Sequence, residues 1–213
     1  MMKINKSNIQ LFINYLDELF PNAYCELNYT KDYELVIAVM LSAQTTDAKV
    51  NKVTEILFSK YPNLNALANA SFDDVELIIR PLGLSKAKAK NTIGIAYKLV
   101  NEYSSVVPSD KDELQKLPGI GNKSAGVIRA EVFKIPDLPV DTHILRVSKR
   151  LGIAKESDGP LEVEQKLKKL ISIDRWIKSH HQIIHFGRYH CLARNPKCKN
   201  CKLSGFCRDF KVN

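Results

Sequence analysis

The spacing of apolar residues is the feature that most constrains the fold of this 213-residue chain. In four stretches they recur every three or four positions, which places them on one face of a helix, whereas a half-buried strand alternates apolar and polar residues. The stretches contain Ile9, Phe12, Leu16 and Leu19; Leu35 and Val39; Val50, Val53, Ile56 and Leu57; and Ile93, Ala96, Tyr97 and Val100. Strand patterns are hard to find. We therefore predict an all-α protein of about ten short helices.

Helix-breaking and helix-capping residues support the same division. Five prolines lie between the predicted helices, at positions 21, 62, 81, 108 and 118. Ser71 and Ser109 each precede an acidic residue by three positions, a pattern typical of helix N-caps. The segments RPLGLSKAKA and KLPGIGNKSA align on Gly83 and Gly119, so each is predicted to form a helix, a tight turn and a second helix.

The charge of the chain favours a polyanionic partner. The formal net charge is +9, which points toward nucleic acid, although many basic proteins bind none. Residues 186–213 contain seven Lys or Arg residues and one Asp, a net charge of +6. The sequence shows no apolar run of about 18 residues and no secretory signal. We expect no membrane partner and a place in the cytoplasm, at the nucleoid if the source is bacterial.

Four of the five cysteines lie close together near the C-terminus, with the spacing C-x6-C-x2-C-x5-C. They are Cys191, Cys198, Cys201 and Cys207, whereas Cys25 stands alone. In reducing surroundings so tight a set favours a metal site over disulfides, because thiolates bind soft metals. Zinc and a [4Fe-4S] cluster both fit four thiolates, and the spacing does not choose between them. The loop inside the set is predicted to carry Arg194 and Lys197 on the surface.

The segment LPGIGNKSAG, residues 117–126, places a lysine directly after a glycine turn. Gly119 and Gly121 permit a tight turn with positive φ, and the residues that follow predict a helix with Lys123 in its first turn. The unpaired N–H groups of such a turn and helix start can bind a phosphate. A plain helix-to-helix connection with a glycine cap is the alternative.

Lys123 is poorly placed for a purely structural role, because a cation is disfavoured at a helix N-terminus. A nucleophilic lysine must be neutral, and free lysine, with a pKa of about 10.4, is almost fully protonated at pH 7. The helix N-terminus, with Lys116 or Arg129 nearby, would favour the neutral amine. A solvated surface lysine or a phosphate contact is the alternative.

The segment LPVDTHILRVSKRLG supplies a candidate carboxylate partner. Asp141 is predicted to cap a helix that begins at Thr142. A fixed carboxylate can also stabilise an oxocarbenium-like sugar, or assist proton transfer to or from a nucleophile. Capping and catalysis are compatible. His143 is a candidate DNA contact, with a hydrogen-bonded structural histidine as the alternative.

Three motifs in this order, LPGIGNKSAGVIRA, VDTHILRVSKRLG and the four cysteines, resemble the endonuclease III family of helix-hairpin-helix DNA glycosylases. YELVIAVMLSAQTTD and LGLSKAKA fit the family's first helical segments, so the resemblance spans nearly the whole chain. It implies a two-lobed all-α fold with a C-terminal iron-sulfur cluster loop. Residues 25–135 would form a six-helix lobe with the helix-hairpin-helix, and residues 1–24 and 136–213 the iron-sulfur lobe.

The resemblance also implies a reaction and its residues. Lys123 would attack C1′ of a damaged nucleoside with help from Asp141, the base would leave, and the Schiff base would undergo β-elimination that nicks the strand. Gln44 and Leu84 would fill the gap left by the extruded nucleotide. From the residues alone, Leu84 is predicted to be a core residue. The cysteines would hold [4Fe-4S], and the implied DNA contacts are Gln44, Leu84, Leu117, Gly119, Ile120, Gly121, His143, Arg194 and Lys197.

The sequence departs from the family pattern at two positions beside the lysine. Asn122 and Ser124 stand where the family commonly has arginine and threonine, and neither change removes a chemical role. We expect a monomeric, bifunctional DNA glycosylase and abasic-site lyase that excises oxidised pyrimidines from double-stranded DNA containing damaged bases or abasic sites. The alternatives are a monofunctional mismatch glycosylase of the same fold and a non-catalytic helix-hairpin-helix DNA-binding module.

Overall fold

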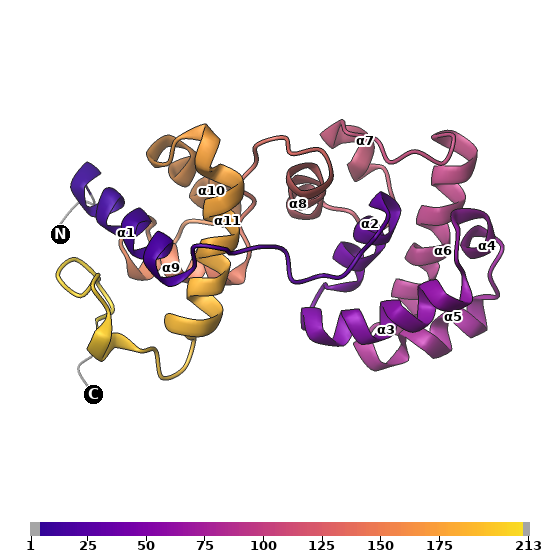
Figure 1. The fold of residues 1–213 in the computed structure, drawn as a ribbon, viewed down its shortest axis with the longest axis horizontal. Helices are drawn as coiled ribbons and strands as arrows, with labels where there is room; N and C mark the ends of the chain where they lie inside the picture. The colour runs from indigo at the N-terminus through magenta and orange to yellow at the C-terminus, as the bar shows by residue number, and fades with distance from the viewer. Residues whose placement is uncertain (1–4, 211–213) are drawn as a thin grey trace. The chain divides into compact units, whose positions relative to one another are not determined.

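The structure, a computed structural model, describes residues 5–210, and in that range its regular elements are helices, without strands (Figure 1). The predicted all-α fold is confirmed. The described α-helices are α1 (Lys6–Leu19), α2 (Asp32–Leu41), α3 (Asp47–Lys60), α4 (Leu64–Ala68), α5 (Phe72–Ile79), α6 (Ser85–Glu102), α7 (Lys111–Gln115), α8 (Asn122–Val132), α9 (Thr142–Arg150), α10 (Pro160–Leu170) and α11 (Trp176–His185). Shorter turns are η1 (Arg80–Leu82), η2 (Ile173–Arg175), the π-helical η3 (Phe186–His190) and η4 (Cys198–Asn200).

The chain divides into two compact units. Glu26–Ile135 forms the central unit, and the described parts of Met1–Cys25 and Pro136–Asn213 form the terminal unit. The central unit contains seven α-helices, α2–α8, where the resemblance implied six; α4 and α7 have five residues each. Among residues 5–210, no helix combines the length and the apolar composition needed to span a bilayer.

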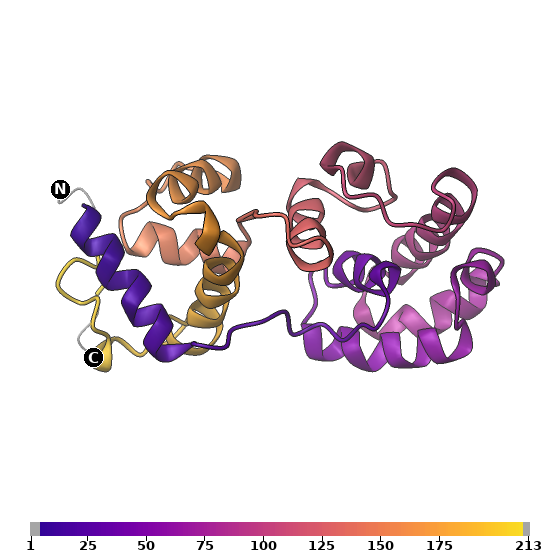
Figure 2. The same ribbon diagram turned by 45° about the horizontal axis from the view of Figure 1, so that its top comes forward.

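Helix α2 forms the core of the central unit. Every residue from Tyr33 to Leu41 is buried, so this helix has no polar face and needs neighbours on all sides. It packs on α3, α6 and α8, and Figure 2 shows it among the other helices of this unit. The helix that carries Lys123 is therefore fixed against the most buried element of the unit.

The helix starts correct one expectation about capping. Asp110, not Ser109, is the N-cap of α7, and its Oδ1 atom accepts hydrogen bonds from the N–H groups of Asp112 and Glu113 at 2.9 and 3.0 Å. The aspartate carboxylate accepts two backbone donors at once, so the helix starts one residue later than predicted. Ser71 is the N-cap of α5, but its side chain makes no capping hydrogen bond.

The terminal unit joins the two ends of the chain. Helix α1 contacts α11, and Figures 1 and 2 show α1 beside the C-terminal segment. Phe12 and Leu16 of α1 are fully buried with Phe186, and the rings of Phe12 and Phe186 meet edge to face with centroids 5.8 Å apart. The periodic residues of the first predicted helix thus form the core of this unit together with residues from the second half of the chain.

Candidate functional site

The glycine turn before α8 is closed by its own backbone. The N–H group of Ile120 donates to the carbonyl oxygen of Leu117 at 3.1 Å, and Gly119 lies between them with φ +78°. Leu117 and Ile120 are 1% and 4% exposed, so both residues are buried beside the turn. Hydrophobic anchoring on both sides of Gly119 therefore holds the turn in place.

The two glycines of this turn face different surroundings. A Cβ atom on Gly119 would lie 2.5 Å from the side-chain nitrogen of Asn91 and 3.0 Å from Cγ of Met40. A Cβ atom on Gly121 would meet nothing within 4 Å. Gly119 is thus needed for close packing, whereas Gly121 leaves open space at the start of α8.

Helix α8 begins at this open space, with Gly121 as its N-cap and no capping side chain. Lys123 is half-buried in the first turn, as predicted. The carbonyl oxygen of Gly121 accepts the first helical hydrogen bond, from the N–H of Ala125 at 2.9 Å. Without a capping side chain, the N–H groups of the first turn and the positive end of the helix dipole can receive an anion beside the amine of Lys123.

Asp141 is the N-cap of α9, as predicted, and lies in the terminal unit. Its Oδ1 atom accepts a hydrogen bond from the N–H of Ile144 at 2.8 Å, and the residue is half-buried. Oδ2 accepts no hydrogen bond from the described residues. One carboxylate oxygen thus orients the side chain, and the other can accept a proton or face a developing positive charge.

His143 packs against the backbone of the terminal unit. A Cβ atom on Gly187 would lie 2.9 Å from Cβ of His143, so the two segments touch only because residue 187 is glycine. The Nη2 atom of Arg146 lies 3.4 Å from Nδ1 of His143. Burial lowers the pKa of His143, the Asp141 carboxylate opposes this, and Arg146 and Arg188 reinforce it. This packing is consistent with a structural role for His143, and because the residue is only half-buried its contact with DNA stays a prediction.

Gln44 and Leu84 occupy two turns of the central unit with the same unusual backbone. Gln44 lies between α2 and α3 with φ +58°, and Leu84 is the N-cap of α6 with φ +50°. Both are exposed, Leu84 by 61%. The expectation from residues alone that Leu84 is a core residue is wrong. Leu84 lies in the turn before α6 and not within a helix, so the periodicity of a helix does not apply to it.

The four cysteines of the C-terminal set are among the residues that line one pocket. None forms a disulfide. Within residues 5–210, no three His, Cys, Asp or Glu side chains converge as a site for one metal ion. Burial raises the pKa of the Cys201 and Cys207 thiols, and repulsion from the other cysteines adds to this. Four soft donors around one pocket fit a metal-containing group that stabilises thiolates.

Two arginines of α9 hold the cysteine loop, and the sequence analysis missed both. Arg150 donates to the carbonyl oxygens of Leu192 at 2.6 Å and Ala193 at 3.1 Å, and its Nη1 atom lies 3.4 Å from Sγ of Cys191. Arg146 donates to the carbonyl oxygen of Cys191 at 3.1 Å. Their partners lie 41 to 45 residues later in the chain, so no local sequence pattern marks either role.

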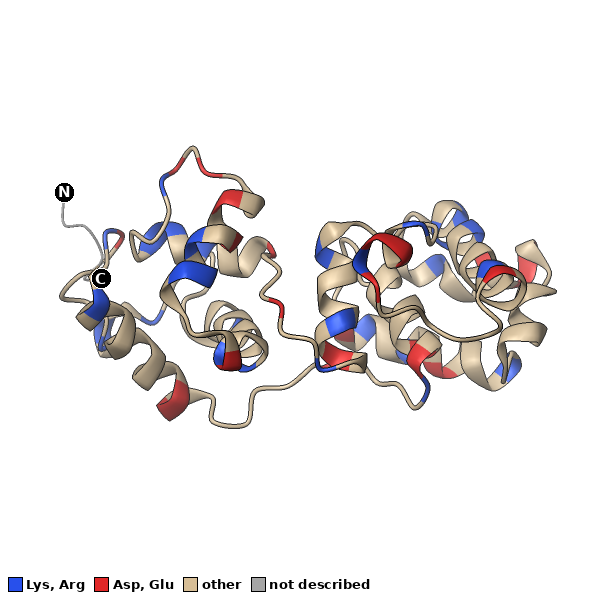
Figure 3. Ribbon diagram, turned by 90° about the horizontal axis from the view of Figure 1, so that it is seen from above, with Lys and Arg blue, Asp and Glu red and all other residues tan. Residues whose placement is uncertain are grey.

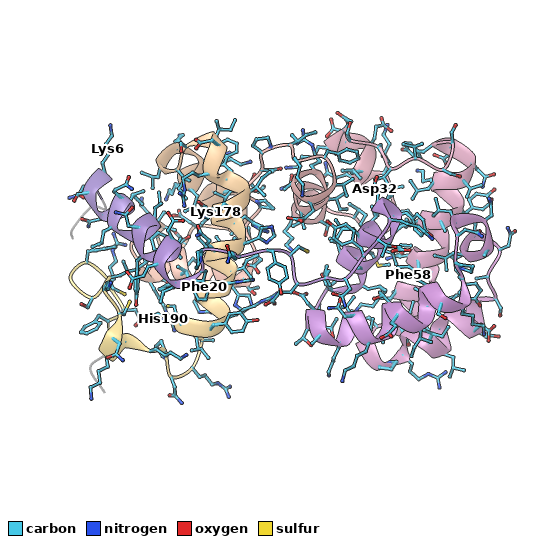
Figure 4. The ribbon with its side chains drawn as sticks, in the orientation of Figure 1. Lys6, Phe20, Asp32, Phe58, Lys178 and His190 are labelled. Atoms are coloured by element: carbon cyan, nitrogen blue, oxygen red, sulfur yellow. The ribbon has the colours of Figure 1, made fainter. Side chains whose placement is uncertain are left out.

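The other side of the loop rests on α1. His190, labelled in Figure 4, stacks on Phe186 with ring centroids 5.0 Å apart and meets the ring of Tyr15 edge to face. The hydroxyl of Tyr15 also donates to the carbonyl oxygen of Asn200 at 3.1 Å. Held from both sides, the loop exposes Arg194 and Lys197, as predicted, and Figure 3 shows Lys and Arg segments near the C-terminal label.

Comparisons with known proteins find similarity over nearly the whole chain. Residues 37–172 match the family described as HhH-GPD superfamily base excision DNA repair protein. Endonuclease III of Bacillus subtilis is 42% identical over 97% of this chain and 94% of its own length. Endonuclease III of Escherichia coli is 36% identical over 96% of both chains. A solved structure of a non-covalent endonuclease III-DNA complex is 44% identical, covers 96% of each chain and superposes with a TM-score of 0.93.

Proposed function

This chain belongs to the endonuclease III family within the HhH-GPD superfamily of base excision DNA repair proteins, and on that premise we propose that it excises oxidised pyrimidines from duplex DNA. The family is one of DNA N-glycosylases with abasic-site lyase activity, so the chain is a DNA glycosylase and lyase of base excision repair. Solved relatives include a trapped endonuclease III-DNA covalent intermediate. The proposal adds the substrate class, the residues and the cofactor.

Lys123 is the nucleophile in this proposal. Its amine attacks C1′ of the damaged nucleoside, the bond to the base breaks, and the Schiff base that forms permits β-elimination at the 3′ side. Asp141 assists by accepting or returning a proton and by opposing the positive charge that develops on the sugar. The observation that carries the assignment is the uncapped start of α8, where Lys123 follows a glycine turn in a position that suits an anion.

The DNA contacts follow from what each segment offers. The backbone around Gly119 and Gly121 is proposed to bind a phosphate, and Gln44 and Leu84 to fill the gap left by the extruded nucleotide. Arg194 and Lys197 are proposed to contact phosphates from the surface of the cysteine loop. We propose that the protein acts as a monomer, in the cytoplasm.

The cysteine set is proposed to hold a [4Fe-4S] cluster through Cys191, Cys198, Cys201 and Cys207. The four thiols line one pocket, which supports a shared site, and membership of the endonuclease III family supports [4Fe-4S] over zinc. When bound, the cluster supplies structural cross-linking of the loop rather than a step of the reaction. The Arg150 side chain then orients the loop by donating to the backbone carbonyl of Leu192, and it faces the thiolate of Cys191.

Reductive trapping tests the nucleophile. Borohydride reduces a Schiff base to a stable amine, so wild-type protein incubated with a thymine-glycol duplex and borohydride should form a covalent protein-DNA adduct. Lys123→Gln should give no adduct on gel electrophoresis. Lys90→Gln is the matched control, because it removes the same charge from an exposed position of α6 in the same unit and should trap normally.

The outcomes separate the alternatives. An adduct of equal yield from Lys123→Gln would refute the assigned nucleophile. Base release without any adduct from the wild type would indicate a monofunctional glycosylase. Binding without base release or adduct would indicate a non-catalytic DNA-binding module.

A further inference from the structure

Lys88 of α6 is a buried lysine with no part in the proposed chemistry. It is only 4% exposed, and its Nζ atom donates to the carbonyl oxygens of Ala43 at 2.9 Å and Leu82 at 3.1 Å. No carboxylate of the described residues pairs with it. Burial lowers the pKa of its ammonium group. Because burying a charge without an opposite charge is costly, the position calls for a reason beyond packing.

The two acceptors of Lys88 belong to the two exposed turns described above. Ala43 directly precedes Gln44, in the turn between α2 and α3. Leu82 ends η1, two residues before Leu84. The backbone N–H of Lys88 also donates to the carbonyl oxygen of Leu84 at 3.0 Å. One residue thus ties both turns to the same point of α6.

Both turns place a non-glycine residue in the left-handed region. Gln44 has φ +58° and Leu84 has φ +50°, conformations that such residues adopt rarely and at a cost in free energy. A backbone of this kind persists only where its surroundings hold it in place. The hydrogen bonds from Lys88 hold the carbonyl before Gln44 and the carbonyl at the entry to Leu84.

We propose that Lys88 is a positioning residue whose ammonium group joins the two turns and presents Gln44 and Leu84 together for insertion into duplex DNA. This inference rests on the proposed function, in which these two side chains fill the gap left by the extruded nucleotide. Holding both side chains in place before DNA arrives removes an ordering cost from binding. Lys88 itself touches no DNA.

The test measures gap filling apart from chemistry. The probe is a duplex with a tetrahydrofuran abasic analogue opposite 2-aminopurine, since the analogue cannot form a Schiff base and 2-aminopurine fluorescence reports insertion beside it. Lys88→Met keeps the length of the apolar stem but removes the terminal ammonium donor. We expect its affinity for this probe to fall about tenfold, a free-energy change of about 1.4 kcal/mol. The fluorescence change should shrink, and affinity for an undamaged duplex should stay within about twofold of wild type.

Controls separate positioning from general damage. Lys90→Met, on the same helix but exposed, should behave as wild type on both duplexes. Thermal unfolding followed by circular dichroism shows whether Lys88→Met folds. Lys88→Gln, which retains a neutral N–H donor, is the second variant, and we expect it to bind the probe with an affinity between those of Lys88→Met and wild type.

A combined variant tests whether Lys88 affects probe binding through Gln44 and Leu84. In Gln44→Ala/Leu84→Gly the side chains to be positioned are gone, so adding Lys88→Met should weaken probe binding by less than about twofold. A further loss of about tenfold would overturn the proposal, as would unchanged probe binding by Lys88→Met alongside weak binding by Gln44→Ala/Leu84→Gly. A wild type that neither prefers the probe nor forms an adduct would instead overturn the proposed function.

Discussion

At the residue scale, glycines two positions apart serve different purposes. Gly119 has a positive φ and lies against Asn91 and Met40, so any side chain there strains the backbone and collides with its neighbours. Gly121 has φ −98° and ψ −179°, an extended backbone open to every residue, with no atom near the missing Cβ. Glycine at position 119 is therefore needed for folding, whereas glycine at position 121 leaves room for a ligand at the start of α8.

Alanine at these positions should separate stability from DNA binding. Gly119→Ala should lower the free energy of unfolding by about 1–3 kcal/mol through strain and collision. Gly121→Ala should cost less than about 1 kcal/mol, yet its methyl group would stand between the backbone N–H groups and a phosphate. We expect about tenfold weaker duplex binding for Gly121→Ala by fluorescence anisotropy. Wild-type affinity in Gly121→Ala would argue against a phosphate at this turn.

At the element scale, the short helix α9 both positions the proposed catalytic carboxylate and binds the cysteine loop. Its N-cap is Asp141, the proposed catalytic carboxylate, and Arg146 and Arg150 further along reach the backbone of the cysteine loop. The cap was predictable because it depends on neighbours in sequence. The role of Arg150 was not, because its partners lie 41 to 43 residues later. The loop that carries Arg194 and Lys197 is thus held by the helix that orients Asp141.

The attachment of α1 should depend on pH through Asp17. Its Oδ1 atom accepts from Arg175 at 2.9 Å, Gln182 at 3.0 Å and Lys178 at 2.9 Å. The hydrogen bond from Arg175 is the main reason that the pKa of Asp17 lies below its ordinary value, against a smaller opposing effect of burial. The folded state therefore binds this proton less tightly than the unfolded state. The contribution of ionised Asp17 to the free energy of unfolding is complete above about pH 5 and is lost as the pH falls through the pKa that Asp17 has in the folded state.

We therefore expect Asp17→Asn to destabilise the protein by about 1 kcal/mol or less at pH 7, since the carboxylate is partly exposed. The difference in melting temperature from wild type should shrink on acidification below about pH 4. Asp174→Asn, at an exposed carboxylate beside Arg175, is the control and should melt like wild type at pH 7. If the melting temperature of Asp17→Asn still differs from that of wild type by the full amount at about pH 3, the stabilisation by Asp17 does not come from its charge.

At the scale of the whole molecule, charge and cysteines combine in one segment. The net charge of +9 is concentrated near the C-terminus, and the cysteine loop carries part of it to the surface. A segment this short cannot bury a core of its own, so α1, α9 and the proposed cluster hold it. These contacts hold the basic C-terminal segment in one conformation, so its charged side chains keep a fixed place on the surface.

Replacing this surface charge should change how DNA binding responds to salt. Each lost phosphate contact lowers the slope of log affinity against log salt by about 0.9, so Arg194→Ala/Lys197→Ala should lower it by about 1.8. Binding should weaken for duplexes of every sequence. The variant should keep the yellow-brown absorbance expected of the cluster, which excludes loss of the cofactor as the cause. An unchanged slope would show that the loop does not face DNA.

The sequence by itself determined the features that depend on near neighbours. Periodicity predicted the helices, the glycine turn placed Lys123 in the first turn of α8, and Asp141 was identified as a cap because a cap bonds to an N–H three residues away. The grouping of the cysteines predicted a shared site. These features depend on residues that are close together in the chain, so they can be predicted from the sequence alone.

Only the tertiary structure decided which side chains are exposed and which distant segments are joined. Leu84 was predicted to be a core residue but is exposed on a left-handed backbone. Lys88, which no sequence pattern singled out, is buried and bonds to Ala43, 45 residues away. Burial depends on what the rest of the chain places around a residue, and a hydrogen bond to a carbonyl oxygen can use any residue. Neither leaves a pattern in the local sequence.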